Sequence, residues 1–425
     1  MRGRLKISFS NPFTHFPQAN LKIAFVTPEF TLDERFSGGL ANYVSRVSVA
    51  LAQQGYEVTV FTRGKADAFE TWRGLEIYTV SGLLDPVSKR LDRLDFFFRN
   101  KLYAPYQDVK AAWCLFRKYR EVFKSKGPFD IVQLANVQAV GLFFRPLENE
   151  KMVTRLSSYR PLWDRRAGIP ENWFVRMRWW LEEKAIRRTI FHYAPSEFVA
   201  KHVAEGYGLK NVQVVETPFF QEVHETDPSL YESALKGKRY LLFFGRLTQM
   251  KGVHRLAEAL PEVLRNFPEL HAVFAGEDTC LAPDGGGMRD YIRKTVGEEM
   301  KNRLLFFDPL RHEQLYPIIR HAEWVVLPSI VDNLPNTCLE AMGLGRPVIA
   351  TKGSCFEQLI THGKNGFLCE ADDAESLRSA LEMALGRGPE DRNSIGREAK
   401  ASLERLSPEN SIPALIDYYK GITST

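Results

Sequence analysis

The chain has 425 residues, of which 44% are hydrophobic and 26% charged, and its formal net charge is +5. This composition excludes a disordered or fibrous chain, and the length exceeds what one hydrophobic core usually supports, so we expect two domains of roughly 200 residues. No apolar run has the length of a signal peptide or a membrane span, which predicts a cytoplasmic protein. The five cysteines lack CxxC spacing and predict neither a zinc site nor a disulfide framework: Cys114, Cys280, Cys338, Cys355 and Cys369.

The first half of the chain has the pattern of a Rossmann-type domain. The apolar run at 21–30 predicts a strand, Gly38 and Gly39 precede a helical pattern that ends at Gly55, and a second strand follows at 57–63. This order implies a parallel sheet with right-handed crossovers. Further strands are expected at 75–80, 129–134, 151–156 and 191–194.

The same order restarts in the second half, after a polar stretch at 221–238 in which we place the linker. We therefore predict domains at 1–225 and 226–408, and we expect the amphipathic segment 409–425 to pack back on the first domain. Open parallel sheets bind ligands at the carboxyl ends of their strands, so two such sheets predict a ligand cleft between them. The strands of the second domain are expected at 239–247, 271–276, 303–308 and 323–329.

Two cations flank the turn after the first strand of the second half. Arg246 follows the strand, and Lys251 precedes a helix that should begin near Gly252. The helix dipole disfavours cations at a helix start, so their presence indicates a binding role rather than two solvated charges. The fixed fork of arginine and the mobile charge of lysine suit the two phosphates of a diphosphate.

A second polar group follows the strand at 323–329. Asp332 lies in the loop, where its carboxylate could accept hydrogen bonds from hydroxyl groups. The helix that follows offers free backbone N–H groups to phosphate oxygens, and Glu340, one turn inside it, could accept from a ribose diol. Thr337 and Glu340 also have the spacing of a capping box, in which the carboxylate only satisfies the helix start, and this alternative stays open.

Several segments together resemble family 4 glycosyltransferases over most of residues 21–385. They are SGGLANYVSRVSVALAQQGYEVTVFTR, APSEFVAKHVAEGYG, GRLTQMKG, AGED, PSIVDNLPNTCLEAMGLGRPVIAT and NGFL. The resemblance implies an α/β GT-B fold, in which two Rossmann-like doubly wound domains face each other across a cleft. It also implies transfer of a sugar with retention from a nucleoside-diphosphate sugar, most simply a UDP- or GDP-sugar, without a metal or another cofactor.

The resemblance assigns acceptor binding to the first domain, 1–225, and binding of the nucleotide sugar to the second, 226–408, and it gives roles to residues of the second domain. Arg246 and Lys251 are assigned to the donor pyrophosphate and Glu340 to the donor ribose. Asp332 stands where the family usually has a glutamate that approaches the donor sugar, so this carboxylate is one methylene shorter, and with the two cations it forms the expected catalytic set. Pro335 has no backbone N–H, so the expected N–H donors to phosphate are Asn336 and Thr337.

In the first domain, Gly38 and Gly39 match the loop that brings backbone close to the donor phosphate and the acceptor, although a tight turn would need the same glycines. Many relatives carry histidines within the segment DIVQLAN (130–136), where this chain has none, and no histidine base is predicted. In the front-face mechanism proposed for the family, the departing phosphate takes the acceptor proton. Two other motifs are interpreted as structural, the pair Asp372–Asp373 as a helix cap and DGGGMRD (284–290) as a flexible loop without a preceding strand.

Residues 151–190 hold ten Lys and Arg residues against four acids, interleaved with four tryptophans, Trp163, Trp173, Trp179 and Trp180. Together with 89–103 and 113–126 they could rest on an anionic membrane surface, or they could be ordinary helices with aromatic side chains in the core. No motif predicts nucleic-acid binding.

We therefore expect a cytoplasmic glycosyltransferase that acts on a saccharide or lipid-linked saccharide in polysaccharide or glycoconjugate biosynthesis. A peripheral position at the inner face of the membrane stays open. A non-catalytic or epimerase-type protein of the same fold that binds a sugar nucleotide is the alternative.

Overall fold

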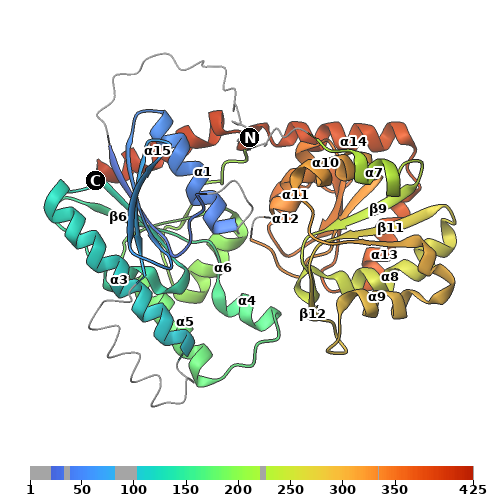
Figure 1. Cartoon of the computed structure of the whole chain (residues 1–425), viewed down its shortest axis with the longest axis horizontal. Helices are drawn as coiled ribbons and strands as arrows, with labels where there is room; N and C mark the ends of the chain where they lie inside the picture. Colours follow the sequence, from blue (N-terminus) through green and yellow to red (C-terminus); the bar gives the residue numbers. More distant parts are fainter. Residues whose placement is uncertain (1–20, 33–38, 82–102, 221–225, 334, 425) are drawn as a thin grey trace.

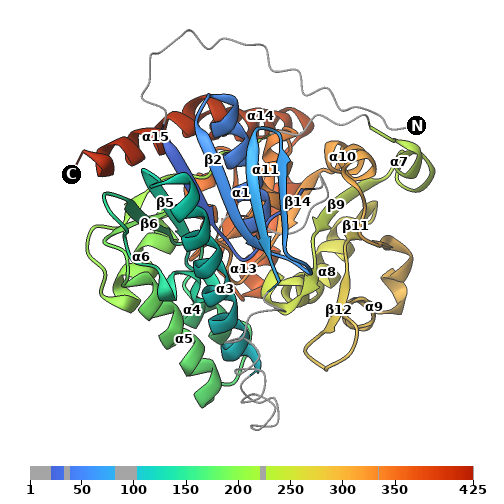
Figure 2. The same ribbon diagram turned by 60° about the vertical axis from the view of Figure 1, so that its left-hand side comes forward.

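The computed structural model describes residues 21–32, 39–81, 103–220, 226–333 and 335–424. These residues form two α/β lobes that lie side by side in Figure 1; in Figure 2 the first lobe comes forward and overlaps part of the second. Each lobe contains its own sheet, so the predicted α/β fold with two doubly wound domains is confirmed.

The first domain is built on a sheet whose order within the described residues is β3-β4-β2-β1-β5-β6-β7-β8. All neighbouring strands are parallel except β3 and β4. Parallel strands covered on both faces are continuous apolar runs, and β5 is buried along its whole length. The strands are β1 (Lys22–Val26), β2 (Glu57–Arg63), β3 (Ala68–Trp72), β4 (Leu75–Val80), β5 (Ile131–Ala135), β6 (Lys151–Arg155), β7 (Phe191–Ala194) and β8 (Gln213–Val214).

Helices cover both faces of this sheet, and β1 shows how the core is divided. Ile23 and Phe25 pack with α1 on one face, whereas Ala24 and Val26 pack with α3 on the other. This alternation follows from the two-residue period of a strand. The helices of the domain are α1 (Gly39–Gln53), α3 (Tyr103–Lys126), η1 (Val137–Phe143), α4 (Arg160–Arg166), α5 (Trp173–Ile186) and α6 (Glu197–Tyr207).

The second domain is built on a parallel sheet of order β13-β11-β9-β14-β15-β16 within the described residues. Its strands are β9 (Arg239–Phe244), β11 (Leu270–Ala275), β13 (Leu304–Phe307), β14 (Trp324–Leu327), β15 (Val348–Thr351) and β16 (Gly366–Cys369). One face is covered by α8 (Val253–Asn266), α9 (Met288–Val296) and α13 (Ala374–Leu385). The other face is covered by α10 (His312–His321), α11 (Asn336–Gly343) and α12 (Phe356–Leu359), with α14 (Pro389–Ser402) beside them.

A small parallel pair of strands, β10 (Leu247–Thr248) and β12 (Asp278–Leu281), lies outside the main sheets. The prediction that the glycine run at 284–290 has no preceding strand is therefore wrong, because β12 ends three residues before it. The run leads directly into α9, and the carboxylate of Asp278 accepts hydrogen bonds from the backbone N–H groups of Met288 and Arg289 at 2.9 and 3.0 Å. The first two backbone N–H groups of α9 are thus already bonded to an aspartate.

The chain passes between the domains twice. The first passage follows β8, and part of it (221–225) lies outside the described residues; α7 (Ser229–Ala234), within the stretch predicted as linker, packs against the second core through Leu230 and Tyr231. The second passage leads through η4 (Glu404–Leu406) to α15 (Pro408–Thr423). The two passages are joined, because the backbone N–H of Phe219 donates to the carbonyl of Leu406 at 2.7 Å.

The C-terminal helix α15 is part of the core of the first domain. Figure 1 shows it, in red, leaving the second lobe and lying along the first beside α1. Ile412, Leu415 and Tyr419 are almost fully buried in the same cluster as β1 and α1. The hydroxyl of Tyr419 donates to the side-chain oxygen of Gln133 in β5 at 2.5 Å.

Candidate functional site

The turn that carries Arg246 and Lys251 is placed by a glycine. Lys251 ends the short helix η2 (Gln249–Lys251), and Gly252 then adopts a left-handed conformation with φ +68° before α8 begins. A Cβ atom at Gly252 would lie 1.8 Å from the carbonyl oxygen of Pro328, which follows β14. Only glycine therefore allows this turn to pack directly on the loop that leads to Asp332.

The structure joins two of the predicted residues in an ion pair. The Nζ atom of Lys251 lies 2.5 Å from the Oδ2 atom of Asp332, and the other carboxylate oxygen accepts from the backbone N–H of Asn333 at 3.0 Å. The Asp332 side chain is 9% exposed and that of Lys251 is 28% exposed. The lysine is therefore neutralised by the carboxylate that is predicted to approach the donor sugar.

Arg246 lies five positions before Lys251 in the sequence, but its side chain is exposed and makes no hydrogen bond or ion pair with another described residue. It follows Gly245, which ends β9 with φ +128°. An exposed guanidinium that no carboxylate neutralises is available for an anionic ligand.

The helix α11 begins two residues earlier than a capping box at Thr337 requires. Its first residue is Asn336, Pro335 is the N-cap, and no side chain caps it. Thr337 lies inside the helix, so the capping-box alternative for Glu340 is wrong. The carbonyl of Pro335 accepts from residues 338 and 339, while the N–H groups of Asn336 and Thr337 lie in the first turn, where a helix supplies no acceptor.

Glu340 faces basic side chains from both domains. Its Oε1 atom lies 3.7 Å from Nε2 of His312 in α10. Arg46, on α1 of the first domain, is near enough to interact with this carboxylate, which partly offsets the lowering of the Arg46 pKa by burial. The sequence did not predict Arg46 or His312 as a neighbour of Glu340, because neither residue lies near Glu340 in the sequence.

Of the two glycines predicted in the first domain, Gly38 lies outside the described residues and Gly39 is the first residue of α1. A Cβ atom at Gly39 would lie 4.0 Å from the side-chain Nδ2 of Asn336. The start of α1 in one domain therefore faces the start of α11 in the other.

The carboxyl ends of the two sheets meet at the domain interface. Asn333, in the loop after β14, accepts a hydrogen bond through Oδ1 from the indole N–H of Trp163 at 2.9 Å. Its carbonyl accepts from the hydroxyl of Ser196, which follows β7, at 3.3 Å. The loop that holds Asp332 is thus in contact with the first domain.

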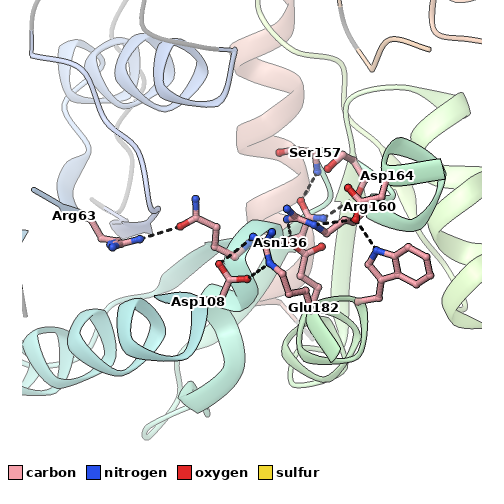
Figure 3. A network of polar contacts seen from close by, with 11 residues as sticks. Arg63, Asp108, Asn136, Ser157, Arg160, Asp164 and Glu182 are labelled. Carbon is pink, nitrogen blue, oxygen red and sulfur yellow. Dashed lines mark hydrogen bonds and ion pairs between the residues drawn. The ribbon is translucent and has the colours of Figure 1, made fainter. Parts of the chain in front are cut away.

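On the first-domain side of this interface, polar side chains form the network shown in Figure 3. Glu182 of α5 is buried, its pKa is raised by that burial, and its Oε1 atom accepts from Arg160 Nη1 at 2.7 Å and from the backbone N–H of Gln138 at 3.1 Å. Gln138 and Ala139 have φ of 54° and 51°, unusual for residues with side chains. Arg63, at the end of β2, donates to the side-chain oxygen of Gln138 at 3.1 Å.

The residues that replace the histidines of many relatives have structural partners. The side-chain oxygen of Gln133 accepts from the hydroxyl groups of Tyr193 and Tyr419. Asn136 joins the ends of β5 and β6, since its side chain accepts from Ser157 N at 2.7 Å and donates to the carbonyl of Ser158 at 2.9 Å.

The remaining acidic and cysteine side chains named from the sequence lie apart from this group of residues. The carboxylate of Asp373 caps α13 and that of Asp372 pairs with Arg255, as a helix-capping loop predicts. The four cysteines whose side chains are described are free and buried, and no cluster of potential metal ligands occurs among the described residues. None of the described helices is both long and apolar enough to cross a membrane.

A cavity of about 780 Å³ lies away from these residues. It is bounded by the β8 edge of the first sheet and by α15, with Gln213, Glu216 and Tyr418 among its lining residues, and none of the candidate residues lines it.

Comparison with known proteins gives two matching family models, "Glycosyltransferase Family 4" over residues 37–219 and "Glycosyl transferases group 1" over 231–402. A D-inositol 3-phosphate glycosyltransferase of Corynebacterium urealyticum is 27% identical over 183 residues, and the match spans only 42% of that relative and of this chain.

Two solved structures share the fold at 17% identity. Sucrose-phosphate synthase from Thermosynechococcus elongatus has a TM-score of 0.71, covering 95% of this chain and 99% of that one. Anabaena HepE in complex with UDP and glucose has a TM-score of 0.65, covering 94% and 100%. Both family models, matched in the order of the two domains, and the shared two-domain fold show that the chain belongs to the group 1 glycosyltransferases of the GT-B type.

Proposed function

We propose that this protein transfers a sugar, with retention and without a metal ion, from a nucleoside-diphosphate sugar to a saccharide or lipid-linked saccharide acceptor. The observation that carries the proposal is the contact of 2.5 Å between Lys251 and Asp332. The exposed Arg246 follows Gly245, where a Cβ atom would lie 3.8 Å from Thr337 in the open first turn of α11. Cations and free N–H groups converge here on one side of the domain interface, as a diphosphate requires.

The chemistry follows from where charge develops. As the bond between sugar and phosphate breaks, negative charge grows on the diphosphate, and preorganised cations and helix N–H groups stabilise it. Lys251 would exchange the carboxylate of Asp332 for a phosphate oxygen, and the released carboxylate would accept hydrogen bonds from the donor sugar. Arg246 and the N–H groups of Asn336 and Thr337 would hold the remaining phosphate oxygens.

Glu340 would accept hydrogen bonds from the donor ribose, with His312 and Arg46 beside it. Gly39 would let backbone of the first domain approach the donor closely. The HepE structure contains UDP and glucose, which supports a UDP-sugar as the first donor to test, with a GDP-sugar as the second.

Retention without a side-chain base requires the departing phosphate to take the proton of the acceptor. The settings of Gln133 and Asn136 support this route, because both amides are already bonded to other groups of the first domain. The acceptor would enter from the first domain, at the carboxyl ends of β2, β5 and β6.

The test is thermal stabilisation by UDP-, GDP-, ADP- and dTDP-sugars, repeated with Arg246→Ala and Glu340→Ala. A ligand at 100 times its Kd stabilises the folded state by about 2.7 kcal/mol, so one nucleotide class should raise Tm clearly. Arg397→Ala, at an exposed position on α14, is the matched control and should keep the shift. No shift with any donor, or a shift that both site variants retain, would refute the assignment of this site.

Transfer itself is measured as release of the nucleoside diphosphate when saccharide and lipid-linked acceptors are added with the donor that binds. The anomeric configuration of the product, read by NMR, tests retention. Binding of the donor with no release for any acceptor would favour a non-catalytic protein.

A further inference from the structure

The outer face of α5 carries a continuous basic and aromatic stripe. Its members are exposed and follow one another at spacings of three and four residues: Trp173, Arg176, Trp180 and Lys184 of the helix, and Arg187, its C-cap residue. This spacing places side chains on one face of a helix. At 1.5 Å per residue the stripe is about 21 Å long. We call these five residues the α5 stripe.

The opposite face of α5 fixes the orientation of the helix. Leu181, Ala185 and Ile186 are buried there, and the buried Glu182 is bonded to Arg160 and to the backbone of Gln138. The helix cannot turn its outer face inward without breaking this packing. The α5 stripe therefore stays on the surface.

The structure separates the four tryptophans of this region into two kinds. Trp163 and Trp179 are half-buried and donate their indole N–H groups to Asn333 and Asp164. Trp173 and Trp180 are instead 66% and 53% exposed. Two large indoles left in water on one helix face, two turns apart, call for a partner that covers them.

The charge of the same surface is strongly positive. Among the residues from 165 to 188, two acids reach the surface. They are Glu171, which lies between Arg165 and Arg176, and Glu183, which pairs with Arg187 at 2.8 Å. Ile169, 42% exposed, adds an apolar side chain beside them. The exposed cations of this range are Arg165, Arg166, Arg176, Lys184, Arg187 and Arg188.

We propose that the α5 stripe docks on a membrane surface that contains anionic lipids. Trp173 and Trp180 would lie among the headgroups, where an indole keeps its N–H hydrated and its ring in an apolar layer. The three cations of the stripe would face lipid phosphates, with their aliphatic stems along the bilayer surface. A duplex nucleic acid would contact the cations through its phosphates but would leave the two indoles in water.

This inference goes beyond the proposed function and does not depend on it, because docking needs neither donor nor acceptor. It has a geometric consequence for the site. The half-buried Trp163 of α4, which precedes α5 in the chain, contacts Asn333 beside Asp332. A bilayer held against α5 would therefore lie against the first domain, the domain that is predicted to bind the acceptor.

The test is cosedimentation of the full chain with phosphatidylcholine vesicles, with and without phosphatidylglycerol, at low and high salt. The variants are Arg176→Glu with Lys184→Glu, and Trp173→Ser with Trp180→Ser. The control is Arg397→Glu with Lys400→Glu, which makes the same change of net charge at exposed positions of α14.

The expected result is binding that requires phosphatidylglycerol, weakens with salt and shifts the tryptophan emission to shorter wavelength. Each cation near such a surface contributes about fivefold to affinity, so the charge-reversed pair should bind at least about 25-fold more weakly while the control binds as the wild type does.

Three results would overturn the proposal: no binding of the wild type to anionic vesicles, an equal loss in the control, or full binding by the serine pair, which would indicate only a general polyanion surface. Melting curves of each variant show that it is folded. Donor stabilisation that the α5 variants retain separates this test from that of the proposed function.

Discussion

Replacing Asp332 by asparagine should tighten the binding of a bare nucleoside diphosphate while it suppresses sugar transfer. In the structure the Asp332 carboxylate binds the Nζ atom of Lys251 at 2.5 Å, so a phosphate must compete with this carboxylate for the lysine. Asparagine is nearly the same size but carries no charge. The variant removes the competitor and also the repulsion between the carboxylate and the phosphates.

The magnitude follows from the burial of the pair. A hydrogen bond to a charged group contributes about 1.5–3 kcal/mol net, and a lysine that is 28% exposed places this pair toward the lower end. We therefore expect Kd for the diphosphate to fall about tenfold, which corresponds to about 1.4 kcal/mol. The rate of transfer should fall by about 100-fold or more, as when one electrostatic contact to a transition state is lost.

The assay is titration calorimetry with UDP, GDP and ADP on the wild type and on Asp332→Asn, followed by turnover with the matching sugar nucleotide. Asp391→Asn makes the same change of charge at an exposed position of α14 and serves as the control. An unchanged or weaker affinity for the diphosphate in Asp332→Asn would show that Lys251 does not receive the phosphates.

Two further predictions concern stability, each measured by urea unfolding. Gly252→Ala should lower the free energy of unfolding by more than about 2 kcal/mol, because the left-handed backbone alone costs roughly 1–2 kcal/mol and the new Cβ would meet Pro328. The control is Gly237→Ala, where φ is +81° and nothing lies near the new Cβ, so only the backbone cost is expected. Equal losses of stability in the two variants would refute the packing argument. Burial lowers the pKa of His192 below 6.5, so the unfolded chain takes up the proton first and the wild type loses stability as the pH falls below about 6.5. His192→Gln should lose less stability over the same pH range. If the free energy of unfolding of the two proteins depends on pH in the same way, His192 is not the group responsible.

Most of the fold could be predicted because the strands are continuous apolar runs and the helices begin at recognisable residues. The segment IVQLA is buried throughout as β5, and α8 begins directly after Gly252, where the sequence placed it. The pair β10 and β12 could not be predicted, because these short strands pair with each other across a gap of about thirty residues and not with a strand of a main sheet. The strand before the glycine run was missed for this reason.

The candidate site could be predicted as a set of residues but not as a geometry. Lys251 and Asp332 are 81 positions apart, and their contact depends on how closely the backbone at Gly252 approaches Pro328. The capping box failed because a helix can begin at a residue that follows proline, which its spacing does not reveal. In α5, aromatic and basic residues occur on every side, so periodicity could not show which tryptophans face outward.

The docking of α15 on the first domain makes the second domain an insertion rather than a second half. The first domain consists of two separate stretches of chain, one before β9 and one beginning at Pro408, held together by contacts such as that of Tyr419 with Gln133. Recombination with a related gene at a single crossover would leave this sheet covered by a foreign helix. Exchanging the second domain between relatives therefore requires the transfer of an internal segment, with both ends at the contact between Phe219 and Leu406.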